Sequence, residues 1–280
     1  MQLLDGKKIA ENIEQQLTQE VNLIYEKYQK KPILAVILVG DDPASQSYVR
    51  MKKKASERVG IQAILHLLSR ETTQEELEGL IQQLNDDSNI NGILVQLPLP
   101  AHLNTHSILA KISVHKDVDG FHPYNVGRVM SGLNAFIPAT PKGIMTLLKS
   151  YNIPLRGKNV VIVGASNIVG KPLYALMLNA ETTVCICHIY TKNLTFHTQN
   201  ADIVCVGVGK PNLITAGMVK EGAIVIDIGI NKLNHHIVGD VDFKNVSPLC
   251  SYITPVPGGV GPMTIISLLE NTLIAFRQQN

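Results

Sequence analysis

Tyr48 and Lys52 are the first side chains whose types and spacing suggest chemistry. Pro43 favours the first turn of a helix, where its missing N–H is not needed. On that helix Tyr48 and Lys52 lie at positions i and i+4 and therefore project from one face. An aromatic ring beside an amine provides a stacking surface and a group that moves protons. The alternative is a surface helix whose basic residues, Lys52 to Lys54, are simply solvated. A functional role for the pair therefore requires further evidence from elsewhere in the chain.

A second candidate site lies in the segment 159–172, which has the pattern of a strand, a glycine-bounded loop and the start of a helix. Gly164 suits a tight turn, and Gly170 allows the helix to approach the strand closely. The N-terminus of such a helix presents N–H groups and a positive dipole end to a pyrophosphate. The spacing differs from the common G-x-G-x-x-G pattern, and a purely structural strand–helix turn is the alternative.

The next predicted strand, 183–188, ends without the acidic residue that holds the ribose 2′-hydroxyl in NAD-preferring folds. Thr191 and Lys192 follow it instead, and these side chains can accept a 2′-phosphate that an acid would repel. The two strands after it also end in glycine-containing loops, 207–211 and 227–231. Because ligands of open α/β sheets bind at the carboxyl ends of the strands, the three loops predict a cofactor cleft that takes NADP.

Composition excludes several functional classes. A net charge of +2 over 280 residues gives no electrostatic reason to expect a nucleic-acid partner. No apolar stretch approaches the ~20 residues that cross a bilayer, and the first residues lack the apolar core of a signal peptide, so we expect no membrane partner. Cys185, Cys187, Cys205 and Cys250 have the apolar surroundings typical of reduced thiols in a cytoplasmic protein. Cys185 and Cys187 with His188 form only a weak metal-ligand pattern, so no metal is expected.

The elements that position these residues alternate between strand and helix. Apolar residues at helical spacing predict helices at 7–28, 43–60, 72–84 and 263–277. Short apolar runs predict strands at 33–39, 61–68, 92–97, 159–163, 183–188, 202–206 and 223–228. The alternation predicts an α/β fold.

A proline-punctuated segment, 136–141, is the expected domain boundary. We predict two three-layer α/β domains around a cleft. The first comprises residues 1–140 and takes back the C-terminal helix at 262–280. The second comprises residues 141–261 and is a Rossmann-type parallel sheet. Within it, the pair His235-His236 lies in an expected hairpin and is interpreted as a surface feature.

Short motifs connect the Tyr48–Lys52 pair to a known family. They are DPAS at 42–45, GILVQLPLP at 92–100 and KDVDGF at 116–121. Together with the pair they resemble the folate-binding segments of bifunctional methylenetetrahydrofolate dehydrogenase/methenyltetrahydrofolate cyclohydrolases, the bacterial FolD family. PVPGGVGPMT at 255–264 resembles the C-terminal signature of that family, and 164–170 resembles its bacterial cofactor loop. The resemblance covers nearly the whole chain in order.

The resemblance implies an NADP-dependent enzyme of one-carbon metabolism that serves purine and amino-acid biosynthesis. Such an enzyme oxidises 5,10-methylenetetrahydrofolate to the 5,10-methenyl form and hydrolyses this to 10-formyltetrahydrofolate in the same site. At matching positions, Lys52 is the catalytic lysine and Gln96 hydrogen-bonds it. Tyr48 packs on the tetrahydrofolate substrate and Asp119 holds the pterin. A cytoplasmic homodimer is also implied.

Further positions match binding residues of the family. For the folate substrate they are Tyr48, Lys52, Gln96, Asp119, Pro257, Gly258 and Gly259. For NADP they are Gly164, Ala165, Ser166, Ile168, Val169, Ile189, Thr191, Lys192 and Ile230.

Three positions depart from the commonest family pattern. Ala139 replaces a cysteine, which argues against a required thiol there. Ala165 replaces an arginine, and Ile189 replaces a serine or arginine beside the 2′-phosphate. Lys192, Thr191 or Lys171 would then have to hold that phosphate.

Two other classes of protein fit parts of the sequence. A catalytically silent NAD(P)-binding regulator would keep the cofactor loops, but we expect it to have lost at least one of the four catalytic positions. A dehydrogenase acting on a hydroxy acid needs an arginine for the substrate carboxylate, and Arg50 and Arg128 are the nearby candidates. Oxidation of methylenetetrahydrofolate with NADP distinguishes the three classes.

Overall fold

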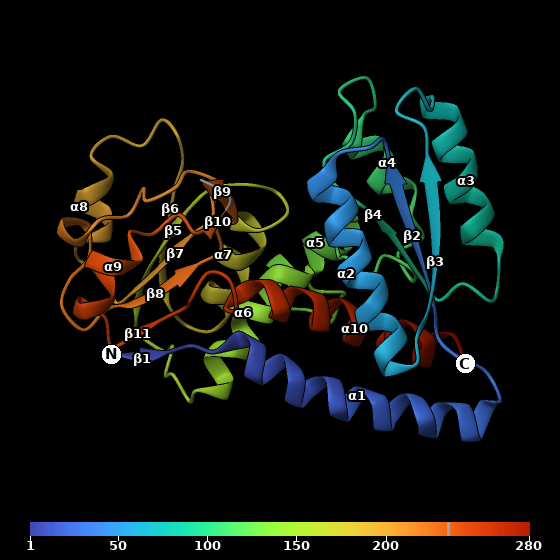
Figure 1. Cartoon of the computed structure of the whole chain (residues 1–280), viewed down its shortest axis with the longest axis horizontal. Coiled ribbons are helices and arrows are strands. Elements are labelled where there is room, and N and C mark those ends of the chain that lie inside the picture. Colours follow the sequence, from blue (N-terminus) through green and yellow to red (C-terminus); the bar gives the residue numbers. More distant parts are fainter. Residues whose placement is uncertain (234–235) are drawn as a thin grey trace. The chain divides into compact units, whose positions relative to one another are not determined.

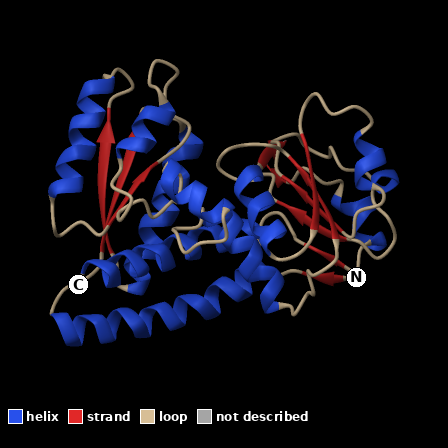
Figure 2. Ribbon diagram, turned by 180° about the vertical axis from the view of Figure 1, so that it is seen from behind, coloured by secondary structure: helices blue, strands red, loops and turns tan. Residues whose placement is uncertain are grey.

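The computed structural model describes residues 1–233 and 236–280. The chain divides into two compact units, whose elements are labelled in Figure 1 and coloured by type in Figure 2. The six-stranded unit comprises Met1–Glu11, Val129–Asn134 and Thr140–Thr264. The three-stranded unit comprises Asn12–Arg128, Ala135–Ala139 and Ile265–Asn280.

The three-stranded unit is built on a parallel sheet with the strand order β3-β2-β4. Its strands are β2 (Ile33–Val39), β3 (Gln62–Leu68) and β4 (Gly92–Val95). Its helical elements are α1 (Gly6–Tyr28), α2 (Pro43–Val59), α3 (Gln74–Asp86), α4 (Thr105–Lys111), α5 (Pro123–Met130) and α10 (Val260–Gln279), of which α1, α5 and α10 extend past its limits.

The central strand β2 is apolar along its whole length because both of its faces are buried. Ala35 and Ile37 share one face and pack with Ile81 of α3 and Ile108 of α4. Val36, on the opposite face, is also fully buried. A parallel strand buried on both faces requires a continuous apolar run rather than an alternating one.

The six-stranded unit contains a parallel sheet with the order β1-β11-β8-β7-β5-β6. Its strands are β1 (Gln2–Leu3), β5 (Asn159–Val163), β6 (Thr183–Cys187), β7 (Ile203–Val206), β8 (Ile224–Asp227) and β11 (Tyr252–Ile253). The helices are α6 (Ala139–Ser150), α7 (Gly170–Asn179), α8 (Leu194–Thr198) and α9 (Phe243–Val246). The strands β9 (Asn231–Leu233) and β10 (His236–Val238) form a separate antiparallel pair.

The order of this sheet places a switch point at β5. The chain passes from β5 to β6 on one side and then returns to β7 on the other side. In open α/β sheets the loops at the carboxyl ends of such strands form the ligand site. The loops in question follow Val163 of β5 and Val206 of β7.

The predicted α/β class and the Rossmann-type sheet are confirmed, and every strand predicted from an apolar run is present. Two short strands, β1 and β11, were not predicted, because two residues are too few to show periodicity. Their pairing carries Met1–Glu11 into the six-stranded unit, whereas the expected division placed these residues in the first domain. His236 is exposed, and His235 lies outside the described residues.

Among the helices of the described ranges, none is long and apolar enough to cross a bilayer.

Helix α10 holds the middle of the KDVDGF segment through a buried amide. Nδ2 of Asn271, a residue only 1% exposed, donates hydrogen bonds to the carbonyl oxygens of Val118 at 2.8 Å and Ile137 at 2.9 Å. All three residues belong to the three-stranded unit. Because a buried carbonyl without a donor is costly, this amide fixes the segment in place.

Asn271→Leu should therefore lower the free energy of unfolding by about 2–5 kcal/mol, since two buried carbonyls lose their donor. Urea unfolding followed by circular dichroism measures the change. Gln278→Leu, at an exposed position of the same helix, is the control and should stay within about 0.5 kcal/mol of wild type. Equal stability of the two variants would show that Asn271 contributes nothing beyond its volume.

Candidate active site

Helix α2 positions Tyr48 and Lys52 because its ends are fixed by local contacts. The Asp42 side chain accepts a hydrogen bond from Ser45 N at 2.7 Å, and Pro43 occupies the first turn. This bond holds the pKa of Asp42 below its usual value. Gly60 ends the helix in the left-handed conformation, with φ of 85°.

The side chain of Lys52 is buried, with 5% of its surface exposed. Its Nζ donates a hydrogen bond to Oε1 of Gln96 at 3.1 Å and lies 4.7 Å from the centroid of the Tyr48 ring. The neighbouring lysines differ: Lys53 forms an ion pair with Glu57 at 3.7 Å, and Lys54 is exposed. The basic run is therefore one buried amine beside two solvated ones.

Gln96 is the first residue after β4, and the sheet fixes it. Its backbone N donates to Ile37 O at 2.8 Å, which continues the ladder with β2. Its Nε2 donates to Leu97 O at 2.7 Å, so the amide oxygen is the atom directed to Lys52. A neutral acceptor orients the amine without adding a negative charge.

Asp119 supplies the charge that balances this amine in part. Burial lowers the pKa of Lys52, and the negative charge of Asp119 opposes that shift. Conversely, burial raises the pKa of Asp119, and the positive charge of Lys52 opposes that shift. The amine is consequently easier to deprotonate than a solvated lysine, and the carboxyl group is harder to ionise than a solvated aspartate.

The backbone around Asp119 is folded by the two residues that begin the same motif. Nζ of Lys116 donates to three carbonyl oxygens at the end of α3, those of Leu84, Asn85 and Asp87, at 2.9, 2.8 and 2.7 Å. The motif is thereby fastened to the neighbouring helix.

Asp117 is the second of these residues. Its carboxylate accepts from Phe121 N at 3.1 Å, His122 N at 2.9 Å and Asn125 Nδ2 at 2.7 Å. Burial raises the pKa of Asp117 to about 7 against these bonds. Asp117 was not predicted as a site residue, because its hydrogen bonds to Phe121, His122 and Asn125 appear only in the folded chain.

In the six-stranded unit, the loop after β5 is shaped by its two glycines. Gly164 has φ of 121°, and a Cβ there would lie 2.6 Å from the carbonyl oxygen of Gly207. A Cβ on Gly170 would lie 1.9 Å from the carbonyl oxygen of Gly164. The expected tight turn and close helix approach are therefore present, and the backbones of the glycine-containing loops after β5 and β7 lie against each other.

The predicted cofactor residues differ in their surroundings. Oγ of Ser166 accepts from Val169 N at 3.2 Å and Gly170 N at 3.4 Å, where α7 begins. Ile189 and Ile230 are 90% and 62% exposed. Single exposed apolar side chains are normal on protein surfaces, so the exposure of Ile189 and Ile230 leaves them accessible to a ligand without requiring one.

The remaining predicted cofactor residues lie on the same loops: Ala165, Ile168 and Thr191 are half-buried, and Lys192 is exposed. Thr191 Oγ1 accepts from His188 N at 2.9 Å and so closes the turn after β6. Val208, in the predicted loop 207–211 after β7, is 43% exposed.

Two buried aspartates, also not predicted, brace the loops after β7 and β8. Asp240 accepts from Val208 N at 2.6 Å, Gly209 N at 3.0 Å and Asn231 Nδ2 at 2.8 Å. Asp227 accepts from the backbone N of Gly229, Asp240 and Val241 at 3.0, 2.9 and 3.0 Å, and burial raises its pKa to about 6. Only the fold brings these two carboxylates together.

The segment Pro257-Gly258-Gly259 lies in the six-stranded unit and is held against the start of α1. Lys7 N donates to Gly258 O at 2.8 Å, and Pro257 is exposed. The structure thus brings Tyr48, Lys52 and Gln96 together in one unit and assigns the predicted proline–glycine segment to the other.

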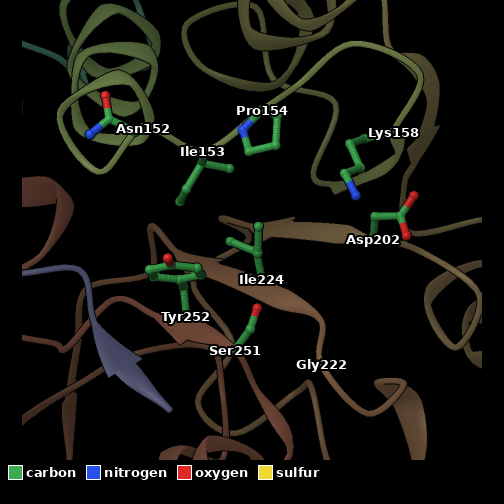
Figure 3. A pocket seen from close by; sticks show the side chains of 9 residues that line it. All are labelled: Asn152, Ile153, Pro154, Lys158, Asp202, Gly222, Ile224, Ser251 and Tyr252. Atoms are coloured by element: carbon green, nitrogen blue, oxygen red, sulfur yellow. The ribbon is translucent and has the colours of Figure 1, made fainter.

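A pocket in the six-stranded unit is unrelated to these loops (Figure 3). Lys158, Asp202 and Ser251 line it, and each directly precedes a strand of the parallel sheet. The pocket therefore lies at the amino ends of the strands, whereas the glycine loops follow the carboxyl ends. We assign it no part in cofactor binding.

Comparison with known proteins gives a family match for each part of the chain. Residues 4–119 match the family model of the tetrahydrofolate dehydrogenase/cyclohydrolase catalytic domain, and residues 138–280 match that of its NAD(P)-binding domain. A curated relative from Wolinella succinogenes, named bifunctional protein FolD, is 63% identical over 276 residues, which is 98% of this chain and 96% of the relative.

Solved structures of the same family also match the chain. A bifunctional FolD enzyme from Campylobacter jejuni is 52% identical, with a TM-score of 0.98 and complete coverage of both chains. A methylenetetrahydrofolate dehydrogenase-cyclohydrolase from Trypanosoma brucei, solved with NADP cofactor and an inhibitor, is 37% identical with a TM-score of 0.95, over 98% of this chain and 96% of that one.

The contact between Gln96 and Lys52 makes a prediction about protonation. Gln96→Glu places a negative charge beside the amine and should raise the pKa of Lys52 by about 1–3 units, because an adjacent opposite charge favours the ammonium form. NMR titration of lysines labelled at Cε measures it. Gln82→Glu on the exposed face of α3 is the control and should leave the pKa of Lys52 unchanged. If both variants titrate like wild type, Gln96 does not control this amine.

Proposed function

The chain belongs to the tetrahydrofolate dehydrogenase/cyclohydrolase family, and we propose that Lys52, Gln96, Tyr48 and Asp119 form the centre at which it acts on its folate. The enzyme oxidises 5,10-methylenetetrahydrofolate to 5,10-methenyltetrahydrofolate with NADP+ and hydrolyses the product to 10-formyltetrahydrofolate. The observation that carries the proposal is the buried amine of Lys52, held by Gln96 at 3.1 Å.

Hydrolysis requires a group that moves protons near neutral pH. A solvated lysine, with a pKa of about 10.4, is a poor base there. Burial lowers the pKa of Lys52 and so increases the fraction of free amine. Lys52 takes one proton from the water that adds to the methenyl carbon and gives it to the ring nitrogen as the bond from that nitrogen to the carbon breaks. The remaining hydroxyl proton is released to solvent as the formyl carbonyl forms, so the cation and water yield the neutral formyl group and one proton. Gln96 keeps the amine in place through both transfers.

The other two residues bind and orient the substrate. The carboxylate of Asp119 accepts hydrogen bonds from the N–H groups of the pterin edge. The Tyr48 ring, half-buried beside Lys52, provides a flat surface for packing. Binding at these points holds the one-carbon bridge near the amine, which lowers the entropic cost of reaction.

The loops of the six-stranded unit fit NADP. The turn at Gly164 leaves no room for a Cβ, and the apolar side chains of Ile189 and Ile230 are exposed for a ligand to cover. Lys192 and Thr191 follow β6 where an acid would disfavour a 2′-phosphate. Bound NADP+ supplies the hydride acceptor of the oxidation. The Trypanosoma brucei relative was solved with this cofactor.

The hydroxy-acid dehydrogenase class needs one arginine for the substrate carboxylate, and the surroundings of both candidates disfavour it. Arg50 is exposed, and the Arg128 guanidinium lies 5.4 Å from the Tyr124 ring. Incubation of the purified protein with NADP and methylenetetrahydrofolate should produce NADPH and the methenyl product. No turnover with either nicotinamide cofactor would refute the proposal.

Three further attributes belong to this proposal. The enzyme is a homodimer, it acts in the cytoplasm, and its one-carbon products serve purine and amino-acid biosynthesis. The resemblance to the FolD family supports all three, and the four free cysteines fit a reducing compartment. Light scattering coupled to size exclusion tests the dimer.

Lys52→Met should reduce cyclohydrolase turnover by about 100-fold or more, because it removes the proton-transfer group while keeping a buried chain of similar length. The assay follows the loss of methenyltetrahydrofolate absorbance. Lys53→Met, which removes a solvated amine next in sequence, is the control and should retain normal turnover. Wild-type hydrolysis in the first variant would remove Lys52 from the mechanism.

Lys192→Ala should raise KM for NADP by about tenfold, because a charge-assisted bond to phosphate contributes about 1.5–3 kcal/mol. KM for NAD should change little, since NAD has no 2′-phosphate. Steady-state kinetics with both cofactors gives the comparison. Lys244→Ala in α9 serves as the control for the loss of an exposed lysine. An equal rise for NAD and NADP would place the phosphate elsewhere.

A further inference from the structure

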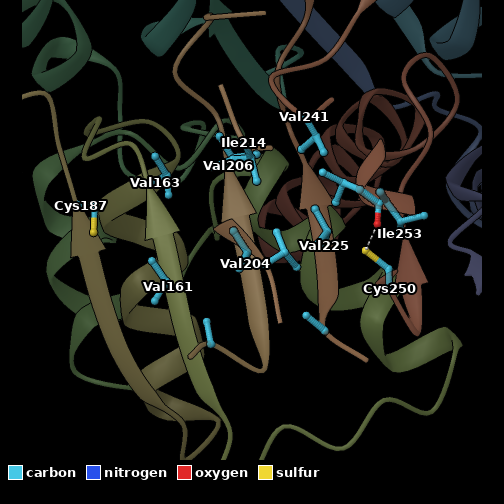
Figure 4. Close-up of a cluster of buried hydrophobic side chains, with 14 residues drawn as sticks. Val161, Val163, Cys187, Val204, Val206, Ile214, Val225, Val241, Cys250 and Ile253 are labelled. Carbon is cyan, nitrogen blue, oxygen red and sulfur yellow. Dashed lines mark hydrogen bonds between the residues drawn. The ribbon is translucent and has the colours of Figure 1, made fainter. Parts of the chain in front are cut away.

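A cluster of metal-ligating side chains lies in the six-stranded unit, apart from the residues assigned to catalysis. Cys185 and Cys187 are two positions apart on β6 and so share one face of the strand. His197 comes from α8, which follows the next loop. Their ligand atoms all lie within 4.8 Å of one another, and Sγ of Cys185 is 3.6 Å from Nδ1 of His197. Figure 4 shows Cys187 at the end of β6.

The sulfur–nitrogen separation in this cluster matches that around a tetrahedral cation. Zinc binds thiolate sulfur at about 2.3 Å and imidazole nitrogen at about 2.0–2.1 Å, so tetrahedral angles place sulfur and nitrogen about 3.5 Å apart. The sulfur–nitrogen distance in the protein is 3.6 Å. Cys185 and His197 therefore need little movement to bind such an ion, and Sγ of Cys187 lies within 4.8 Å of both ligand atoms.

We propose that Cys185, Cys187 and His197 bind one zinc ion or a cation of similar softness. Two thiolates and one imidazole are ligands that such ions prefer. Three protein ligands leave a fourth position for water, which is typical of an exchangeable ion rather than a purely structural one. Sequence spacing pointed to His188 as the third ligand, but His188 is exposed and its Nδ1 accepts from Tyr190 N at 3.2 Å.

The charges balance when the ion binds. Each of the two thiols releases one proton, and the two thiolates together offset the 2+ charge of the ion. The complex therefore leaves no net charge at Cys187, which is only 1% exposed. A neutral complex avoids the large cost of an uncompensated charge in a buried position.

The ion would link the two ends of the loop between β6 and α8, because its ligands come from both elements. Cys187 is the last residue of β6, and His197 lies in α8 beyond the loop. Ile189 and Tyr190 within it are 90% and 85% exposed, so few contacts hold its tip. This loop carries Lys192, so an effect of the ion on NADP affinity rests on the proposed function, whereas binding of the ion does not.

Cobalt titration of the reduced, full-length protein without oxygen tests the site. A thiolate-to-cobalt absorption band in the near ultraviolet should grow to one equivalent, and added zinc should abolish it. Cys185→Ser and His197→Gln should weaken zinc binding at least about tenfold, measured by competition with a chromophoric chelator. Cys250→Ala and His188→Gln are the matched controls and should bind like wild type.

Thiol protection supplies a readout without variants. Cys185 is partly exposed, so zinc should slow its alkylation by iodoacetamide, measured by mass spectrometry of its peptide. A missing cobalt–thiolate band, or equal alkylation with and without zinc, would overturn the site. Because neither measurement uses folate or NADP, a failure here is distinct from a failure of the dehydrogenase assay.

Discussion

The burial of one amine is the constraint on which the catalytic unit depends. Lys52 is 5% exposed and hydrogen-bonded to an amide oxygen, not to a carboxylate. Burial without a strongly paired charge lowers the pKa of Lys52, whereas a direct ion pair would raise it. The surrounding structure must therefore keep Asp119 close enough for its negative charge to stabilise the ammonium form of Lys52. It must also leave Gln96 as the group that hydrogen-bonds the amine directly.

Much of the three-stranded unit serves this arrangement. The sheet fixes Gln96 through the backbone of Ile37, and a cap at Asp42 fixes the start of α2. Lys116 fastens the KDVDGF motif to α3, and the buried amide of Asn271 fixes the motif at Val118. Each of these contacts is internal to the unit, so the position of the amine follows from packing and not from a mobile loop.

In the six-stranded unit the candidate site is shaped by close approach of backbone segments and not by a cluster of reactive side chains. Gly164 and Gly170 allow two loops and a helix to approach within distances that any Cβ would forbid. Asp227 and Asp240 then satisfy the backbone N–H groups of the neighbouring loops. A cofactor that is held by main-chain groups and small residues needs this kind of rigid frame.

The sequence by itself determined the α/β class, the strands with long apolar runs, the glycine loop and the Tyr48–Lys52 face, because periodicity and backbone sterics are local. It also singled out Gln96 and Asp119 through motifs. Only the tertiary structure decided that Asp117, Asp240 and Asn271 brace those sites, and that His197 rather than His188 lies beside Cys185. Such contacts join residues far apart or differently oriented, and side-chain direction after a strand depends on packing that local sequence does not specify.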